Sequence, residues 1–427
     1  MSFETVSVIG LGYIGLPTAA MFAAYGKNVI GVDVNQHAID TINSGKIHIV
    51  EPDLDAIVHK AVNDGKLKAV LTPEAADAFL IAVPTPFLPK KNKADIPQPD
   101  LKYIQAAAKA IAPVLKKGDL VILESTSPVG ATEQMAEWLA KARPDLTFPQ
   151  TQGEVSDIRV AHCPERVLPG HVVRELVEND RVIGGMTDKC SKLAVQLYKT
   201  FVKGECVITN SRTAEMAKLT ENSCRDVQIA FANELSMICD KLDIDVWELI
   251  SLANRHPRIN ILQPGPGVGG HCIAVDPWFI VSKTPEQAQL IHTARKVNDS
   301  KPEWVINKVK VAISDFLQAN TDKTAKDITI ACYGLTFKAD IDDLRESPAL
   351  EITKRIAEMH SGRIIVVEPN IVDLPNFLKG RADLVNYEDA IKLADVVIVL
   401  VDHKEFVASL YNSMELKKLI DTKGVWN

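Results

Sequence analysis

One cysteine in this sequence stands where a thiol could act as a nucleophile. Cys272 follows the Pro/Gly-rich stretch 263–270, and Asp276 lies four residues further on. A glycine-rich loop leaves backbone N–H groups available, and an ammonium group beside a thiol lowers its pKa, so that thiolate accumulates. We therefore treat Cys272 and Asp276 as a candidate reactive site that needs a cation brought to it.

A predicted helix offers that cation. Lys218, Asn222 and Arg225 are spaced i, i+4 and i+7, so they share one face of the helix. Acidic residues interleave with them, and from this helix alone a solvated, salt-bridged face is the favoured reading. The chemical hypothesis requires Lys218 to lie beside Cys272 in the fold.

A second motif could hold a dinucleotide. Gly10-Leu11-Gly12-Tyr13-Ile14-Gly15 directly follows a predicted strand and opens a helix, and Asp33 ends the next strand, about 20 residues further on. The glycines allow a tight turn and close approach of backbone N–H groups to a pyrophosphate, while Asp33 would accept hydrogen bonds from the ribose hydroxyls. No arginine follows Asp33 to bind a 2′-phosphate, so the motif predicts NAD rather than NADP. The alternative is a structural strand–helix turn.

Polar residues also follow two later strands, where ligands of parallel sheets bind. Thr85 and Thr126 could hydrogen-bond a cofactor, although capping of the strand ends explains them equally well. Further cationic candidates could gather around a diphosphate: Arg166, Arg255, His256, Arg258, Lys338 and Arg345. Each of these taken singly is better explained as a surface ion pair.

The elements that position these residues alternate. Strand-like runs at 5–9, 28–33, 78–83, 120–124 and 160–163 are separated by helical stretches such as 101–115 and 132–142. This pattern predicts a doubly wound parallel sheet over about the first 200 residues. The Pro/Lys-rich stretch 84–99 predicts an exposed loop without an assigned role.

The middle of the chain predicts helices. Residues 213–242 contain no Gly or Pro and predict one long helix, and helical stretches follow at 246–253 and 287–316. Cys224 and Cys239 on the long helix are expected to be buried and inert. Strand-like runs return at 328–333, 363–368 and 394–401, with a helix at 348–360. The predicted fold is therefore α/β, with two Rossmann-type doubly wound domains joined by a long central helix and a helical middle region.

These segments predict three domains: 1–209 for NAD, 210–318 for the helical middle with the cysteine loop, and 319–427 as a second, Rossmann-like domain. The seven cysteines form no CxxC pair, which argues against a zinc site and a disulfide framework, so we expect no metal and a cytoplasmic location. Lys and Arg number 48 against 55 Asp and Glu, a formal net charge of −7, which argues against general binding of nucleic acid or an anionic membrane surface. The sequence contains no apolar run long enough for a membrane span.

Seven segments together resemble the UDP-glucose/GDP-mannose dehydrogenase family: GLGYIGLP, VPTPF, ESTSPVG, CPERVLPG, AEMAKLTENSCRD, QPGPGVGGHCIAVDPWF and GLTFKADIDDLRESPALEI. They run in order over essentially the whole chain. The cysteine loop is similar to that of the branch acting on UDP-N-acetyl-D-mannosamine. The UDP-glucose branch usually has Phe after the reactive Cys and Lys before the Asp, where this chain has Ile273 and Val275.

The resemblance implies an NAD-dependent four-electron oxidation of a UDP-sugar C6 alcohol to a carboxylate, through a cysteine thiohemiacetal and thioester. It implies that Cys272 is the nucleophile, that Lys218 is the acid/base and oxyanion-stabilising group, that Asn222 assists, and that Asp276 positions or activates water. The implied NAD contacts are Gly10, Gly12, Tyr13, Ile14, Gly15, Asp33, Thr85, Thr126 and Arg345. The implied substrate contacts are Arg166, Val167, Lys218, Asn222, Arg225, His256, Arg258, Gly269, Phe337 and Lys338.

The resemblance also implies a homodimer with the long helix at its core, in which the Arg258 position can reach the neighbouring subunit's site. Three alternatives remain open at this point. The substrate could be another UDP-sugar, such as UDP-N-acetylglucosamine or UDP-glucose. The chain could be a two-electron dehydrogenase, which would need neither Cys272 nor the second α/β domain, or a regulator that binds NAD without turnover.

Overall fold

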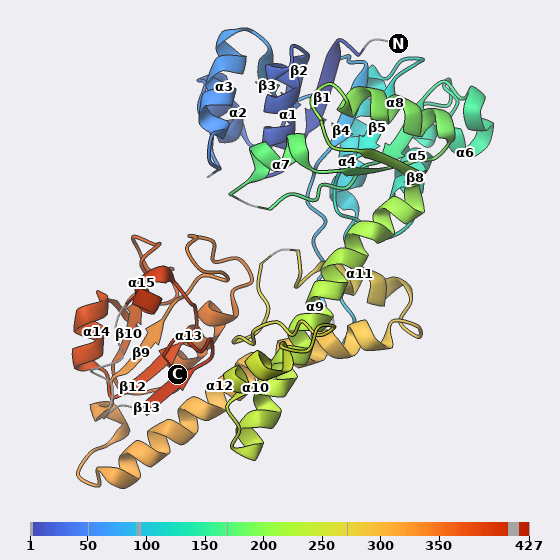
Figure 1. The fold of residues 1–427 in the computed structure, drawn as a ribbon. Coiled ribbons are helices and arrows are strands. Elements are labelled where there is room, and N and C mark those ends of the chain that lie inside the picture. Colours follow the sequence, from blue (N-terminus) through green and yellow to red (C-terminus); the bar gives the residue numbers. More distant parts are fainter. Residues whose placement is uncertain are drawn as a thin grey trace. The chain divides into compact units, whose positions relative to one another are not determined.

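The computed structural model describes residues 3–49, 51–90, 92, 95–168, 170–270, 272–408 and 418–426. The chain divides into two compact units (Figure 1). The first unit comprises Met1–Glu221 and Trp278–Thr284, and the second comprises Asn222–Pro277 and Pro285–Asn427. Each unit is built around its own β-sheet.

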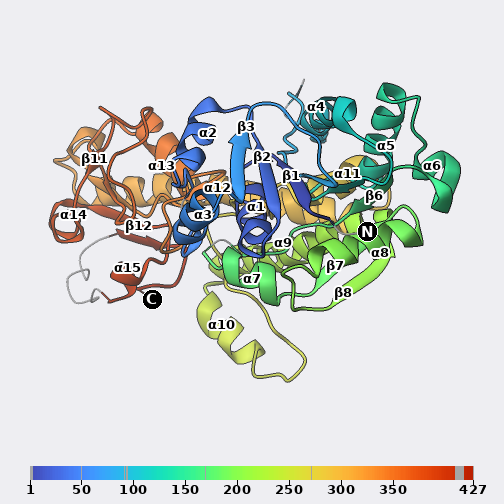
Figure 2. The same cartoon turned by 90° about the horizontal axis from the view of Figure 1, so that it is seen from above.

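The sheet of the first unit has eight strands in the order β3-β2-β1-β4-β5-β6-β7-β8. The strands are β1 Thr5–Ile9, β2 Asn28–Val32, β3 Leu67–Val70, β4 Ala78–Ile81, β5 Leu120–Leu123, β6 Arg159–His162, β7 Arg181–Gly185 and β8 Cys206–Asn210. Its first six strands follow the order typical of dinucleotide-binding Rossmann sheets. Figure 2 shows β3, β2 and β1 side by side in this order.

Helices cover both faces of this sheet. The helices of the first unit are α1 Gly15–Ala24, α2 Gln36–Asn43, α3 Leu54–Asn63, α4 Lys102–Ile111, α5 Ala131–Ala142, α6 Pro149–Gln152, α7 Val172–Glu178 and α8 Asp188–Tyr198. Successive residues of β4 and β5 alternate between the two cores, as the pleat of a strand requires. Leu80 and Ile122 pack into the core with α1, α3 and α7, whereas Phe79 and Val121 pack into the core with α4 and α5.

One pairing differs from the predicted parallel sheet. β6 and β7 are antiparallel, while β7 and β8 are parallel and are joined through α8. A mixed sheet of this kind is common where strands are added at the edge of a parallel core. The sequence analysis identified neither β7 nor β8.

Two helices cross from one unit to the other. α9 runs from Ser211 to Leu242 as one continuous helix, as the absence of Gly and Pro predicted, and α11 spans Asp276–Lys283. The second unit also contains α10 Val246–Ala253 and α12 Gln289–Ala319. Cys239 on α9 is buried as expected, but the expectation for Cys224 was wrong, because its position on the helix faces outward and it is exposed.

The sheet of the second unit has five parallel strands in the order β11-β10-β9-β12-β13. The strands are β9 Ile330–Tyr333, β10 Ile364–Val367, β11 Asp383–Leu384, β12 Val396–Val399 and β13 Lys418–Asp421. The helices of this region are α13 Pro348–Met359, α14 Tyr387–Leu393 and α15 Lys404–Ala408 (Figure 1). One face of the sheet packs with α12 and α13 and the other with α14, so this is the second doubly wound sheet that the sequence predicted.

Candidate functional site

The glycine turn after β1 has the geometry of a dinucleotide fingerprint. Gly10 has φ +92°, and a Cβ added there would lie 2.5 Å from the Ala82 carbonyl oxygen. A Cβ at Gly15 would lie 1.8 Å from the Gly10 carbonyl oxygen, so α1 packs directly on the turn. At Gly12 an added Cβ would meet no atom of the described chain within 4 Å, and this open backbone is what a pyrophosphate needs. Tyr13 and Ile14 lie on the same turn, and Tyr13 is exposed.

Asp33 is fixed beside that turn. Its Oδ2 accepts a hydrogen bond from the backbone N–H of Leu11 at 2.8 Å, and its Oδ1 accepts one from the N–H of Asn35 at 2.9 Å. Each carboxylate oxygen retains acceptor capacity for ribose hydroxyls. His48, which the sequence analysis did not single out, lies in the electrostatic field of Asp33; burial lowers the pKa of its imidazole, and Asp33 opposes that shift.

Thr85 provides a test of whether NAD fits this edge of the sheet. Its side chain is buried, and its Oγ1 has no hydrogen-bond partner among the described residues. A buried hydroxyl without a partner is costly unless a ligand supplies one. β2, β1, β4 and β5 are neighbours in the sheet, so Asp33, the glycine turn, Thr85 and Thr126 follow adjacent carboxyl ends. These residues fit a dinucleotide.

Buried ionisable groups that the sequence analysis missed lie beyond β5 and β6. Arg181 bonds Glu165 at 2.8 Å, and the Tyr198 hydroxyl donates to Glu124 at 2.5 Å. Burial raises the pKa of Glu124 to about 7, although the charge of Arg181 opposes the shift. Glu124 is the last residue of one predicted strand and Glu165 lies two residues beyond another, so the rule for strand ends could have found them.

Arg166 and Val167 follow Glu165. Arg166 forms an ion pair with Glu221 of α9 at 2.6 Å. Val167 is half-buried and packs against the core of the first unit.

The described residues of the loop predicted at 84–99 include a pair that joins its two ends. Phe87 pairs with Pro99 in an isolated antiparallel bridge. The Phe87 ring makes an edge contact with Phe279 of α11, with 5.8 Å between ring centroids, and Lys90 lies 5.7 Å from the centre of the Trp278 ring. The loop therefore holds α11, the helix whose first residue is Asp276.

In the second unit three of the four candidate catalytic residues come together. The Asn222 side-chain amide donates to Oδ2 of Asp276, and the Asp276 backbone N–H donates to the Cys272 carbonyl at 2.9 Å. Asp276 is buried, Asn222 is half-buried and Cys272 is exposed. Lys218 precedes Asn222 by one turn of the continuous helix α9. The meeting of Lys218 and Cys272 stays a prediction.

The glycine loop before Cys272 rests on the segment that follows β9. A Cβ on Gly269 would lie 2.6 Å from the Glu346 carbonyl oxygen and 2.7 Å from Cβ of Phe337. Gly270 has φ +78°, and its N–H donates to the Arg345 carbonyl at 3.2 Å. Gly269 and Phe337, predicted as substrate contacts from distant parts of the sequence, are therefore neighbours.

The remaining candidate cations are exposed. Arg345 forms an ion pair with Asp343 at 2.6 Å, and Lys338 adjoins Phe337. Arg225 is exposed on α9. His256 and Arg258 follow α10, and the Arg258 N–H donates to the His256 ring at 3.4 Å.

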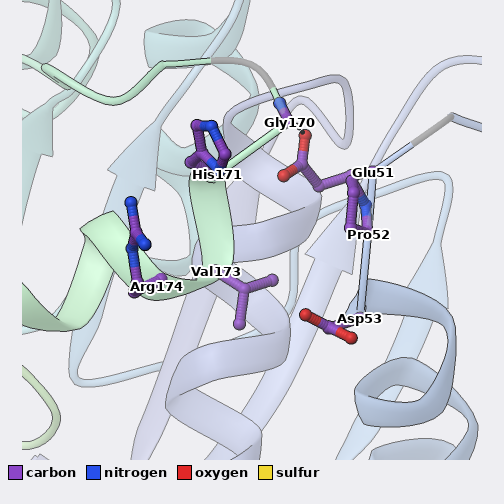
Figure 3. A pocket seen from close by; sticks show the side chains of 7 residues that line it. All are labelled: Glu51, Pro52, Asp53, Gly170, His171, Val173 and Arg174. Atoms are coloured by element: carbon purple, nitrogen blue, oxygen red, sulfur yellow. Dashed lines mark hydrogen bonds between the residues drawn. The ribbon is translucent and has the colours of Figure 1, made fainter.

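A cavity of about 150 Å³ in the first unit contains none of these candidates (Figure 3). It is lined by Glu51, Pro52, Asp53, Gly170, His171, Val173 and Arg174. Glu51 accepts hydrogen bonds from the backbone N–H groups of Gly170 and Val172, so its carboxylate is already engaged. The cavity is smaller than the roughly 300–1,000 Å³ of ordinary ligand sites.

The glycine turn with Asp33 in one unit, and the cysteine loop supported by a second Rossmann-type sheet in the other, define a dinucleotide-dependent dehydrogenase with a candidate thiol nucleophile. The chain belongs to the UDP-glucose/GDP-mannose dehydrogenase family. Residues 4–202 match the family's NAD binding domain, residues 212–300 its central domain and residues 331–427 its UDP binding domain. The resemblance seen in the motifs, the α/β fold and NAD as the cofactor are thereby confirmed.

Similar proteins span the full chain. A UDP-N-acetyl-D-mannosamine dehydrogenase of Yersinia pestis is 66% identical over 426 residues, covering 100% of both chains. An NDP-N-acetyl-D-galactosaminuronic acid dehydrogenase of Ralstonia nicotianae is 63% identical and covers 100% of this chain and 97% of its own. The solved structure of a UDP-D-ManNAc dehydrogenase from Pyrococcus horikoshii has a TM-score of 0.84 and 37% identity, covering 99% of this chain and 96% of its own.

Proposed function

We propose that this protein oxidises the C6 alcohol of UDP-N-acetyl-D-mannosamine to the carboxylate, with reduction of two NAD per sugar. The observation that carries the proposal is the group formed by Cys272, Asn222 and Asp276 beside the glycine loop, in a chain of this family. The choice of sugar is supported by the Yersinia pestis relative. The Ralstonia nicotianae relative, of nearly equal identity, bears the name of another sugar, so the sugar needs its own test.

NAD supplies the chemistry of hydride acceptance in each of the two oxidations. For the first, Lys218, or a water held by Asp276, removes the proton from the C6 hydroxyl. The Cys272 thiolate then attacks the aldehyde carbon and forms a thiohemiacetal, whose oxyanion Lys218 and Asn222 stabilise. Asn222 has two amide hydrogens, so it can donate to Asp276 and to the oxyanion together.

The second oxidation converts the thiohemiacetal to a thioester on Cys272. Asp276, which is buried at the start of α11, positions the water that hydrolyses this thioester and releases the acid. Without a thiol, the aldehyde has no covalent route to the acid. An enzyme that oxidises the alcohol to the acid therefore needs such a cysteine, whereas an alcohol dehydrogenase that stops at the aldehyde does not.

Most of the proposed NAD contacts belong to the first unit and most of the proposed UDP-sugar contacts to the second; the exceptions are Arg345 for NAD, and Arg166, Val167 and Lys218 for the UDP-sugar. NAD contacts are assigned to Gly10, Gly12, Tyr13, Ile14, Gly15, Asp33, Thr85, Thr126 and Arg345. UDP-sugar contacts are assigned to Arg166, Val167, Lys218, Asn222, Arg225, His256, Arg258, Gly269, Phe337 and Lys338. The segments 1–209, 210–318 and 319–427 are proposed as the NAD-binding, middle and UDP-sugar-binding domains.

We further propose a homodimer in the cytoplasm. The apolar stripe of α9 consists of Met216, Cys224, Phe231, Ile238 and Leu242, all exposed. At 100° per residue these positions fall within about 80° of one another on the helix. A hollow of about 530 Å³ adjoins Met216 and is lined by Arg212, Thr213, Met216, Ala217 and Thr220. A second copy of the chain would cover this surface. Among the described residues, no helix has both the length and the apolar character to cross a membrane.

The decisive experiment counts NADH formed per sugar consumed, with UDP-N-acetyl-D-mannosamine, UDP-N-acetylglucosamine and UDP-glucose side by side. Two NADH with the first sugar supports the proposal. One NADH would indicate a two-electron dehydrogenase, and none with any of the sugars would leave only an NAD-binding regulator. A preference for another of the three sugars would correct the substrate but not the chemistry.

Cys272→Ser separates the chemistry from cofactor binding. We expect NAD affinity to be unchanged and acid formation to fall on the order of a thousandfold or more, because the covalent intermediate is lost. The matched control is Cys206→Ser, a half-buried cysteine at the start of β8, which should keep its activity. Full activity of Cys272→Ser would rule out the thioester mechanism.

A further inference from the structure

A buried histidine–glutamate pair in the second unit has no part in the proposed chemistry. Glu368 directly follows β10 and His403 lies shortly after β12; the two residues are 4% and 0% exposed. Nε2 of His403 lies 3.1 Å from Oε2 of Glu368. Two ionisable side chains buried at the carboxyl ends of parallel strands require a reason beyond packing.

The hydrogen bonds fix the tautomer of His403. Its Nδ1 lies 3.0 Å from the backbone N–H of Asp340 and 3.0 Å from the side-chain amide of Asn370. A backbone N–H can only donate, so Nδ1 accepts and the ring proton is on Nε2, facing Glu368. Both ring nitrogens are therefore engaged. Asp340, His403 and Glu405 lie close enough together to suggest a metal site. Both nitrogens of the His403 ring are already used in hydrogen bonds, which argues against a metal ion there.

Glu368 ties the pair to the segment after β9. Its Oε2 accepts hydrogen bonds from the backbone N–H groups of Leu335 at 2.7 Å and Thr336 at 3.3 Å. Burial alone would raise the pKa of Glu368, but the hydrogen bonds from His403 and from backbone N–H groups outweigh it, and the pKa is lowered. The ionised carboxylate thus holds one end of the 335–340 segment, and His403 holds Asp340 at the other end.

Phe337 lies between these two anchors. Its N–H donates to the Asp343 carbonyl at 3.1 Å, and its ring lies under the glycine loop, where a Cβ on Gly270 would come within 2.9 Å of it. Cys272 is two residues beyond Gly270. An unbroken series of contacts within the second unit therefore leads from the buried pair to the loop that carries the thiol.

We propose that His403 and Glu368 are positioning residues that lock the 335–340 segment for UDP and, through Phe337, seat the loop that carries Cys272. The inference rests on the proposed function for the role of Cys272. The new element is a coupling between two parts of the proposed site. The same buried pair orders both the 335–340 segment, which would contact UDP, and the loop that carries Cys272. A 1 Å displacement of such a loop is sufficient to impair catalysis.

The test compares His403→Ala with wild type in the full-length protein. We expect the Kd for UDP, measured by calorimetry, to rise about tenfold, and hydrogen exchange in 265–272 and 335–340 to accelerate at least as much. NAD affinity should change much less, because Arg345 is the one proposed NAD contact that lies in the second unit. His403→Asn, whose side-chain oxygen can still accept from the Asp340 N–H, should recover part of the UDP affinity. His360→Ala is the matched control, because His360 hydrogen-bonds the Ile328 carbonyl, away from the 335–340 segment.

A folded His403→Ala with unchanged UDP affinity and unchanged exchange in both segments would overturn the proposal. Equal effects in His360→Ala would also overturn it, because they would show general destabilisation. If His403→Ala does not fold, Asn370→Ala replaces it, because this change removes one hydrogen-bond donor to Glu368 and one to His403. Asn370→Ala must then raise the Kd for UDP and accelerate hydrogen exchange in the two segments. If it does neither, the proposal fails. Neither readout needs turnover, so failure to oxidise any UDP-sugar would contradict the proposed function and leave this test intact.

Discussion

Thr85 shows how a single side chain can indicate a binding site before any ligand is seen. From the sequence its hydroxyl was equally well explained as a strand cap. In the structure the hydroxyl is buried without a partner among the described residues, beside the carboxyl ends of β1, β4 and β5. A cap would be hydrogen-bonded, so the unpartnered hydroxyl argues against capping, and the role of Thr85 in NAD binding stays a prediction.

Thr85→Val tests this role with a change that preserves shape. We expect NAD affinity to fall about tenfold while the stability of the protein without NAD stays equal or increases, because an unsatisfied hydroxyl is removed. Calorimetric titration with NAD and thermal unfolding measure the two effects. Thr353→Val is the control, since its hydroxyl is also buried and without a partner among the described residues but lies on α13. Equal NAD affinity in the two variants would contradict the role.

Glu124 makes the stability of the first unit depend on pH. Because burial raises its pKa to about 7, the folded protein retains a proton that the unfolded chain releases near pH 4.5. The proton retained on Glu124 stabilises the folded protein. This stabilisation is fully present below the pKa that Glu124 has in the unfolded chain, and it is lost as the pH rises through about 7.

Glu124→Gln should remove that dependence. As the pH rises from 5 to 8, the free energy of unfolding of wild type should fall relative to that of Glu124→Gln. We expect this relative change to reach up to about 3 kcal/mol. Denaturant titrations without NAD at the two pH values measure the shift. Glu137→Gln, an exposed carboxylate on α5, should show none. If the free energies of unfolding of Glu124→Gln and wild type differ by the same amount at both pH values, the raised pKa of Glu124 is contradicted.

At the scale of elements, α9 combines two surfaces. Lys218, Asn222 and Arg225 occupy one side of the helix, and the apolar stripe occupies another. The sequence identified the first surface but treated Cys224 as core, because helical spacing alone does not say which apolar face is covered by the same chain.

Phe231→Glu tests the stripe as a dimer seam. Phe231 is 51% exposed in the single chain, so we expect the variant to fold and to elute as a monomer in size-exclusion chromatography with light scattering, while wild type elutes as a dimer. Val372→Glu, at a residue 93% exposed, is the matched apolar-to-acidic control and should stay dimeric. A Phe231→Glu protein that remains a dimer would place the interface elsewhere.

For the molecule as a whole, the family's two nucleotide-binding domains match separate parts of the chain. The family's NAD binding domain matches residues 4–202 and its UDP binding domain matches residues 331–427. Each sheet has its own cores and its own loops at the carboxyl ends of its strands. Each nucleotide should therefore leave a separate footprint.

Hydrogen exchange measured with each nucleotide alone tests this division. NAD should slow exchange at 10–15 and 83–86, and UDP should slow it at 265–270 and 335–340, each by at least about threefold. The segment 143–158 of the first unit, which carries no candidate contact, serves as the internal reference. Protection of 10–15 by UDP alone would contradict the assignment.

Local sequence patterns predicted most of the helices and strands and the glycine fingerprint. The strands 5–9 and 120–124, the long helix and the turn at Gly10–Gly15 follow from β-branched runs, helical periodicity and the positive φ that glycine permits, all of which are local properties. Local rules also found Asp33 and Cys272. They could not exclude a structural turn or an inert thiol.

Which of these residues meet could be learned only from the folded chain. The bond from Asn222 to Asp276, the contact of Phe337 with Gly269 and Gly270, and the pairing of His403 with Glu368 join residues that are tens of positions apart in the sequence. No period or spacing encodes such contacts, because they depend on how sheets and loops pack. The antiparallel pairing of β6 with β7 escaped prediction for the same reason: strand direction within a sheet is fixed by long-range packing rather than by the residues of either strand.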